Sequence, residues 1–200
     1  MKRFTCSISF FVVAIYLLLS AEKSWLLLFW AAAAIHELGH LLALLLAGGR
    51  ALRFRFRLSG AELQYSGNRI SYGGEVWLAL AGPLMNLLCA CAGALFARRW
   101  PYEWLYRFTG CHLVLALFNL LPALPLDGGR VLRTVLEVAF PLEGERFAGI
   151  VSLCVGVVLT LTGSVLFVKS GNFTLFSAGG VILLRSLPKS TLHLSKKMLK

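Results

Sequence analysis

Long apolar runs divide this chain, and polar residues are confined to the short intervals between them. A helix needs about 20 mostly apolar residues to cross the hydrocarbon core of a bilayer. The pattern therefore predicts an all-α polytopic membrane protein with about six transmembrane helices. The first run follows Lys2 and Arg3 and is also compatible with a signal peptide. The six runs, of which the first and last are the shortest, are Cys6–Ala21, Trp25–Ala47, Val76–Ala97, Leu105–Leu121, Phe147–Val168 and Asn172–Leu187.

The composition supports a membrane protein. Of the 200 residues, 58% are hydrophobic and 14% are charged, against roughly 45–50% and 25% in soluble domains. Because little chain remains outside the apolar runs, we expect one membrane-embedded domain over residues 1–200. The five cysteines all lie in apolar runs. An odd number of cysteines at lipid depth is no disulfide framework, and they are expected to act as small hydrophobic residues.

The longest polar interval, Gly48–Glu75, has a different periodicity. Basic and apolar residues alternate from Leu52 to Leu58, and shorter alternating pieces occur at Ala61–Tyr65 and Arg69–Tyr72. Alternation with a period of two predicts strands, so we expect a small β-hairpin or three-stranded sheet between the second and third transmembrane helices. One alternative is a basic loop that contacts anionic lipid head groups. The functional interpretation is a sheet edge that pairs with an extended substrate.

The net charge of +11 is distributed unevenly among the intervals. If the N-terminus is cytoplasmic and all six runs span, 15 of the 20 Lys and Arg residues lie inside and 5 lie outside. Basic loops stay cytoplasmic, so both termini are predicted on that side. The basic charge is then a topology signal. Because the sequence has no nucleic-acid-binding motif, no nucleic-acid partner is expected. The lipid bilayer is the expected environment of the chain.

The chain following the fourth run cannot continue as a regular helix. Between Asn119 and Arg130 it carries Pro122, Pro125 and the pair Gly128-Gly129, all of which disfavour helix. The flanks are nevertheless apolar enough for membrane depth. Irregular backbone is tolerated there only when it is buried in protein or lines a wet cavity. This helix break therefore indicates a site, and we expect it to open toward the cytoplasm.

The second run contains the sequence His36-Glu37-Leu38-Gly39-His40, an instance of H-E-x-x-H. Residues i and i+4 lie on one face of a helix, so both imidazoles can reach one metal ion. Glu37 lies beside that ion without binding it and is placed to act as a general base. Placing three ionisable groups near the middle of a transmembrane helix costs free energy, so a functional site is the expected explanation for them. The motif predicts a single catalytic zinc.

A hydrolytic zinc site usually has three protein ligands and one open position. Asp127 is the single aspartate of the chain and lies in the helix break, which makes it the first candidate for the third ligand. His112, inside the fourth run, is the alternative. His112 lies seven residues before Asn119 and shares its helix face, so it is also suited to a hydrogen bond between helices.

These motifs resemble those of the site-2 proteases. The resemblance combines His36–His40 with Asn119-Leu120-Leu121-Pro122 and Leu126-Asp127-Gly128, and Ala81–Asn86 (AGPLMN) is similar to the family's G-P-x-x-N signature. It covers about residues 25–133, the expected core of the domain. The six-span layout with a cytoplasmic active site resembles the stage IV sporulation protease, which releases a sporulation sigma factor from its membrane-tethered precursor.

The resemblance implies a zinc metalloendopeptidase that cuts membrane-tethered protein substrates within or near a transmembrane segment. It implies that His36, His40 and Asp127 bind zinc, that Glu37 is catalytic, and that Asn119 lies beside the site and contacts substrate. Many relatives also carry a PDZ domain, and the sporulation enzyme carries a CBS domain. Neither is expected here, which leaves regulation to a membrane partner of unknown identity.

Two other classes of protein share parts of this pattern. A membrane metallopeptidase of another kind usually takes a glutamate or a further histidine as its third ligand, and Asp127-Gly128 argues against that class. A non-proteolytic zinc scaffold or transporter needs ligands but no adjacent base. The presence of Glu37 therefore favours the protease.

Overall fold

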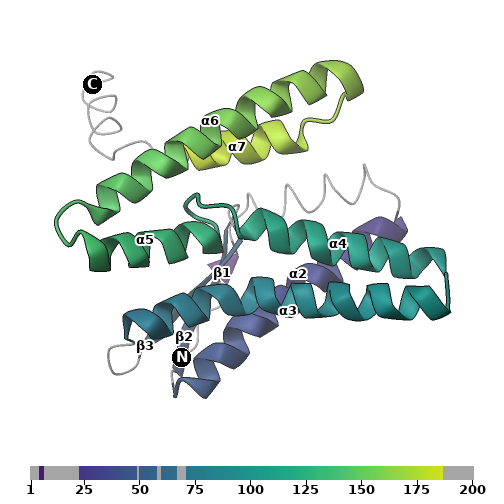
Figure 1. Cartoon of the computed structure of the whole chain (residues 1–200), viewed down its shortest axis with the longest axis horizontal. Helices are drawn as coiled ribbons and strands as arrows, with labels where there is room; N and C mark the ends of the chain where they lie inside the picture. The colour runs from purple at the N-terminus through teal and green to yellow at the C-terminus, as the bar shows by residue number, and fades with distance from the viewer. Residues whose placement is uncertain (1–4, 7–22, 49, 58–59, 67–70, 187–200) are drawn as a thin grey trace. The chain divides into compact units, whose positions relative to one another are not determined.

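The computed structural model describes residues 5–6, 23–48, 50–57, 60–66 and 71–186, which form two compact units, residues 1–120 and 121–200. Short strands accompany the helices of the first unit, and the second unit is helical in the described part of the chain (Figure 1). The elements of the first unit are β1 (Thr5–Cys6), α2 (Lys23–Leu46), β2 (Arg50–Arg57), β3 (Gly60–Ser66), α3 (Tyr72–Arg99) and α4 (Glu103–Asn119). Those of the second are α5 (Asp127–Ala139), α6 (Gly144–Ser170) and α7 (Thr174–Ser186).

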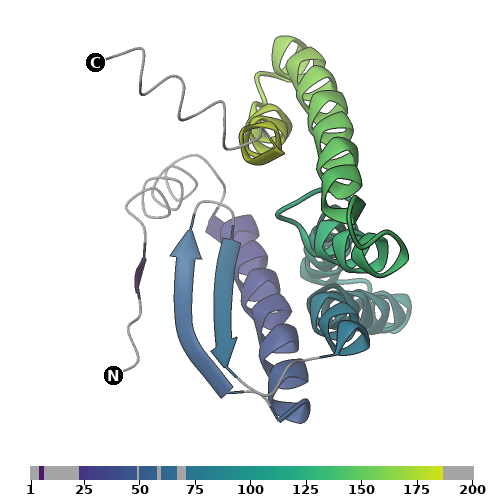
Figure 2. The same ribbon diagram turned by 90° about the vertical axis from the view of Figure 1, so that its left-hand side faces the viewer.

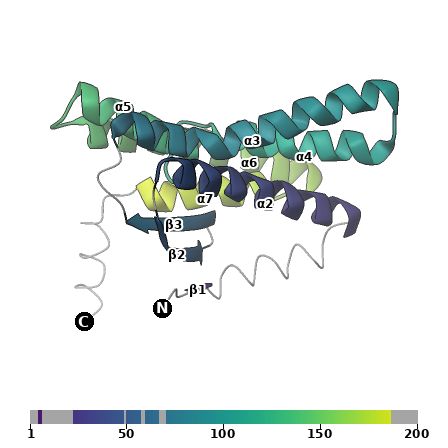
Figure 3. The same cartoon turned by 90° about the horizontal axis from the view of Figure 1, so that it is seen from below.

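Helices α2, α3 and α4 pack closely because glycines lie at their crossings. A Cβ atom on Gly39 of α2 would lie 2.6 Å from the backbone oxygen of Ala81 in α3. A Cβ on Gly93 of α3 would lie 2.5 Å from Oγ1 of Thr109 in α4. Small residues of this kind let transmembrane helices approach at backbone distance. Figure 3 shows α3 and α4 running side by side from their connecting turn.

The polar interval after α2 contains β2 and β3, which pair antiparallel from Arg50↔Ser66 to Arg57↔Gly60. The two strands lie alongside α2 (Figure 2). The strand order is β1-β2-β3, with β1 parallel to β2. The predicted strand at residues 69–72 is wrong at its C-terminal end. Ser71 caps α3 by accepting a hydrogen bond from the Gly74 N–H at 3.2 Å, so the helix begins at Tyr72.

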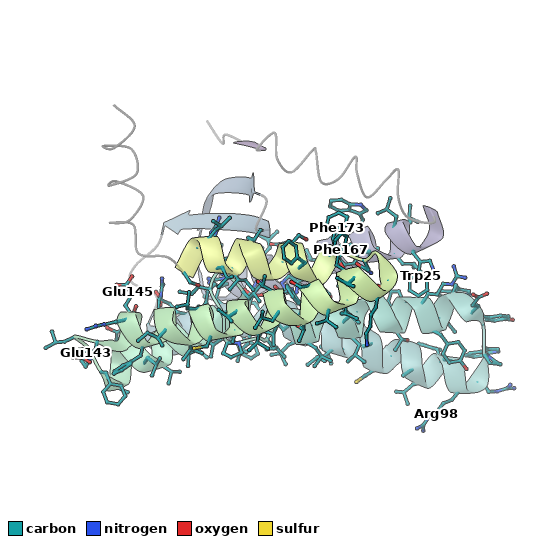
Figure 4. The ribbon with its side chains drawn as sticks, turned by 90° about the horizontal axis from the view of Figure 1, so that it is seen from above. Trp25, Arg98, Glu143, Glu145, Phe167 and Phe173 are labelled. Carbon is teal, nitrogen blue, oxygen red and sulfur yellow. The ribbon has the colours of Figure 1, made fainter. Side chains whose placement is uncertain are left out.

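In the second unit, α6 and α7 form a tight pair. A Cβ on Gly163 would lie 2.3 Å from the backbone nitrogen of Phe176, and one on Gly179 would lie 2.6 Å from that of Thr160. The turn between the helices uses Gly171 in the left-handed region at φ 71°, where glycine carries no steric cost. In Figure 4, Phe167 lies at this end of α6, and Glu143 and Glu145 lie at the other.

Three helices in the described residues are long and apolar enough to cross a membrane: Trp25–Leu46, Tyr72–Arg99 and Gly144–Ser170. On α6, Val158, Leu161 and Val165 are each more than half exposed, as expected for a surface covered by lipid. Six spans are not confirmed. The predicted fourth and sixth runs form helices of 17 and 13 residues. The first run, apart from Cys6, lies outside the described residues.

The helix break is shorter than predicted. Helix α4 ends at Asn119, as Pro122 requires, but α5 already begins at Asp127. The pair Gly128-Gly129 was expected to interrupt helix and instead lies in the first turn of α5. The reason is packing, since a Cβ on Gly129 would lie 2.3 Å from the carbonyl carbon of Ala123. Glycine at this position lets the start of α5 fold directly against the preceding turn.

Candidate metal centre

The two histidines of the H-E-x-x-H motif meet on one face of α2. His36 and His40 are 5% and 8% exposed, and their Nε2 atoms lie 3.2 Å apart. Their rings meet edge to face, with centroids 4.8 Å apart. Two imidazole nitrogens this close can bind the same ion. The sequence prediction for this pair rested on the H-E-x-x-H motif and its helical spacing, and the two rings lie on one face of α2.

The ring of His40 is oriented by the main chain of α3. Its Nδ1 lies 2.8 Å from the carbonyl oxygen of Leu78. Because a carbonyl oxygen only accepts hydrogen bonds, Nδ1 carries the proton and donates it. In the neutral ring, Nε2 then keeps its lone pair and is free of a proton. This is the arrangement that metal-binding histidines commonly have, with the non-ligating nitrogen bonded to a carbonyl or carboxylate.

His36 is bonded to Asn86, a residue to which the sequence analysis gave no role of its own. Its Nδ1 lies 3.3 Å from Nδ2 of Asn86 in α3, and Oδ1 of Asn86 lies 3.0 Å from Nδ1 of His112 in α4. Asn86 and His112 are both fully buried. His112 therefore makes the interhelical hydrogen bond that was one of its two sequence interpretations. The signal that could have found Asn86 is the AGPLMN segment, of which it is the last residue.

Gly82 of α3 lies directly against the two imidazoles. A Cβ atom at this position would lie 2.4 Å from Nε2 of His40 and 2.9 Å from Cε1 of His36. The backbone of α3 thus packs directly against the two imidazole rings. No residue larger than glycine fits there without moving the histidines.

Gly82→Ala is expected to weaken metal binding at least about tenfold, because the added methyl group displaces a ligand ring. Gly73→Ala is the matched control on the same helix, since a Cβ there has no neighbour within 4 Å. Metal content after purification and a competitive chelator titration measure the effect. Equal metal affinity in the two variants would contradict the close approach of α3.

Asp127 is buried, at 6% exposure, and is the first residue of α5. The N-terminal end of a helix favours a carboxylate through its free N–H groups and dipole. The Nη1 atom of Arg130, one turn further on, lies 3.4 Å from Oδ1 of Asp127.

Ser152 of α6 holds the turn that precedes Asp127. Its Oγ accepts a hydrogen bond from the Leu124 N–H at 2.9 Å, and it donates one to the Ala148 oxygen at 2.7 Å.

Ser152→Ala is expected to lower the free energy of unfolding by about 1–3 kcal/mol, since it leaves a half-buried backbone N–H without its acceptor. Ser164→Ala is the control, because Ser164 bonds only to the Thr160 oxygen of its own helix, at 2.8 Å, among the described residues. Thermal unfolding of both variants in the same detergent would measure the difference. An equal loss in the two would show that the bond to Leu124 contributes nothing.

The two remaining predicted site residues differ in their surroundings. Glu37 is half-buried on α2, one residue after His36. Asn119 is the last residue of α4, and its Nδ2 donates to the Leu115 oxygen at 3.0 Å. Its predicted contact with substrate stays a prediction.

The donor set suits zinc. His36 and His40 are buried imidazoles in the first unit, and Asp127 is a buried carboxylate in the second. Two imidazoles and one carboxylate match the three-ligand pattern of hydrolytic zinc sites, which leaves one position open. The close approach of Gly82 and the carbonyl bonded to His40 are further features of such a site.

Comparison with known proteins agrees with this chemistry. Residues 97–163 match the model of peptidase family M50. The chain is 27% identical over 166 residues to a zinc metalloprotease of Methanocaldococcus jannaschii, covering 78% of this chain and 48% of the relative. It is 32% identical over 145 residues to a protein named as a zinc metalloprotease in Synechocystis, covering 66% and 37%. The chain thus spans about half or less of these relatives' length.

The structure is similar to the site-2 protease of Methanocaldococcus jannaschii, with a TM-score of 0.69 over 92% of this chain and 88% of the other. At 23% identity this likeness shows the fold alone. Both curated relatives are named as zinc metalloproteases, and the structural likeness adds the fold. The chain is therefore similar to proteins of peptidase family M50.

Proposed function

We propose that this chain is an intramembrane zinc metalloendopeptidase that cleaves membrane-tethered proteins within or near a transmembrane segment. In this proposal His36, His40 and Asp127 hold one zinc ion, and Glu37 is the general base. The observation that carries the proposal is the pair of buried imidazoles, 3.2 Å apart, on a helix apolar enough to cross a membrane. Buried polar groups of this kind on a membrane helix indicate a functional site.

The chemistry follows from these groups. A zinc ion held by His36, His40 and Asp127 would supply Lewis-acid chemistry, which would polarise a peptide carbonyl and make water a better nucleophile. The Glu37 carboxylate takes a proton from the attacking water and delivers it to the nitrogen of the leaving amine. The Leu78 oxygen and Asn86 hold the two imidazole rings in place during these steps. Nothing further is required of the protein for acid–base catalysis.

The sheet supplies a means of holding substrate. A peptide bond inside a transmembrane helix is shielded by the helix itself, so the substrate must unwind near the cut. Among the described strands, β3 lies at the edge of the order β1-β2-β3. An exposed edge can pair with an extended segment through main-chain hydrogen bonds. We therefore assign β3 to hold the unwound substrate, and Asn119 to contact it beside the zinc.

The topology and the biological substrate extend the same proposal. The distribution of basic residues favours cytoplasmic termini and a cytoplasmic opening of the site. A protease that opens to this side can release a cytoplasmic protein from its membrane anchor. The resemblance to the stage IV sporulation protease supports a sigma-factor precursor as one such substrate.

The test is co-expression of the intact protein and of an inactive variant with a panel of membrane-tethered transcription-factor precursors, sigma-factor precursors included. Cleavage is measured on gels and zinc by elemental analysis. About one zinc per chain together with cleavage of at least one precursor supports the proposal. Zinc without cleavage of any precursor would favour a zinc-binding scaffold or transporter, and absence of zinc would overturn the metal centre itself.

A further inference from the structure

One end of the helices α2, α3 and α4 carries a dense group of exposed aromatic side chains. Half of the ten Trp and Tyr residues of the chain lie here, and each of these five is between 44% and 58% exposed. Trp and Tyr favour the boundary between hydrocarbon and water, because their rings are apolar and their N–H or O–H groups are polar. The five residues are Trp25, Trp100, Tyr102, Trp104 and Tyr106.

Three arginines accompany these rings. Arg98 and Arg99 are exposed in the last turn of α3, and Arg107 lies near the start of α4. Figure 4 shows Arg98 at the same end of the helices as Trp25. The topology proposed above puts this end on the outer side of the membrane, where basic residues are normally depleted, so the topology rule does not explain them. Positive charge is favourable in the last turn of a helix, but that accounts neither for Arg107 nor for the aromatic side chains.

The contacts of the arginines show which charges are available to a ligand. The guanidinium carbon of Arg107 lies 5.1 Å from the ring centroid of Trp25, which joins α4 to α2, and Nε of Arg107 donates to Oε1 of Glu103 at 3.1 Å. Glu103 therefore offsets the charge of Arg107. Arg98 and Arg99 have no carboxylate partner among the residues that the structure describes. These two exposed guanidinium groups are suited to bind phosphate.

Distances along two helices place these aromatic rings at the edge of a bilayer. Trp25 precedes His36 by eleven residues, or about 16 Å along α2. Tyr102 precedes His112 by ten residues, or about 15 Å along α4. Both histidines contact the side chain of Asn86, so the two helices measure to the same level. Half of the hydrocarbon thickness of a bilayer is also about 15 Å, so rings at the head-group boundary leave His36 near the middle.

We propose that Trp25 and residues 98–107, here called the aromatic–basic end, bind the head groups of anionic phospholipids and thereby fix the depth of α2 in the membrane. The aromatic rings lie at the hydrocarbon boundary, and Arg98 and Arg99 bind lipid phosphate. Lipid is the occupant because the adjoining surface of α3 is apolar, with Leu95 and Phe96 66% and 56% exposed, where the acyl chains of the same lipids would lie. The inference goes beyond the proposed function and depends neither on zinc nor on a substrate.

Tryptophan fluorescence in vesicles tests the depth of the aromatic–basic end. Of the five tryptophans of the chain, Trp30 and Trp77 lie elsewhere, so the full chain with Trp30→Phe and Trp77→Phe reports on this end alone. It is reconstituted with phosphatidylcholine that carries bromine either close to the head group or near the end of the acyl chain. Bromine close to the head group is expected to quench the fluorescence more strongly. Equal quenching by the two lipids, or quenching by neither, would overturn the proposal.

The same protein tests the choice of lipid. Vesicles of phosphatidylglycerol and phosphatidylcholine are compared with bromine on one lipid or on the other, so that quenching reports which lipid is enriched beside the three tryptophans. A basic residue at the membrane surface favours anionic lipid about fivefold. Arg98→Gln together with Arg99→Gln is therefore expected to lower the preference for phosphatidylglycerol by about tenfold or more. Arg98→Lys with Arg99→Lys keeps both charges and should keep the preference.

Arg146→Gln together with Arg185→Gln is the matched control. Both are exposed arginines of the second unit, on α6 and α7, so the net charge falls by the same amount. The preference for phosphatidylglycerol beside the three tryptophans should not change. An equal loss in the two glutamine pairs would assign the effect to the overall charge of the protein and overturn the proposal, as would an unchanged preference after the loss of Arg98 and Arg99.

Discussion

Glu37→Gln is expected to reduce cleavage of a membrane-tethered substrate by about 10²–10⁴-fold while the protein keeps its zinc. The amide has the size of the carboxylate but cannot take a proton from water at neutral pH. The proposed ligands are untouched, because the substitution leaves the imidazoles of His36 and His40 and the carboxylate of Asp127 in place. Cleavage rates and elemental analysis on the same preparation measure both halves of the expectation.

The control for this variant is Glu103→Gln, an exposed glutamate in the first turn of α4. It removes one negative charge from the same unit of the protein without changing the metal centre, so its cleavage rate should match the unchanged enzyme. A zinc-loaded Glu37→Gln protein that cleaves at the full rate would remove Glu37 from the mechanism. A variant that has lost its zinc would instead indicate that Glu37 is a ligand.

Asp127→Ala is expected to lose both zinc and cleavage. Without the proposed carboxylate ligand, two imidazoles remain. Loss of a residue that only hydrogen-bonds to a ligand lowers metal affinity by up to about 100-fold, so loss of a ligand itself should lower zinc affinity by more than that. Retained zinc is measured after dialysis against a weak chelator, and the cleavage rate is measured with and without added zinc. An active, zinc-replete Asp127→Ala enzyme would overturn Asp127 as the third ligand.

Glu137→Ala separates the loss of a ligand from the loss of a charge on α5. Glu137 lies on the same helix and interacts with Arg133, with 3.4 Å between the Glu137 oxygen and the Arg133 nitrogen. Both side chains of this pair are partly exposed, and such ion pairs contribute little to stability, so the variant should fold and keep its zinc. Equal zinc loss in the two variants would show that α5 is sensitive to any change of charge.

Much of the fold is readable from the sequence because lipid imposes a simple rule. Residues buried in a bilayer must be apolar and helical over a long run, and the second, third and fifth runs indeed form helices that can span. The rule says less about short segments. The end of α4 depends on the turn that follows it, and the start of α5 depends on Gly129 packing against Ala123. For that reason the Gly-Gly pair was wrongly expected to stay outside a helix.

By itself, the sequence determined the part of the metal centre that depends on one helix. His36 and His40 face the same side because four residues make about one turn of α2, and no other element is needed. The tertiary structure decided which groups surround them. Leu78, Gly82 and Asn86 come from α3, and His112 comes from α4. These contacts join residues 26 to 50 positions apart, and no local periodicity encodes them, because they arise only when glycines let three helices pack at backbone distance.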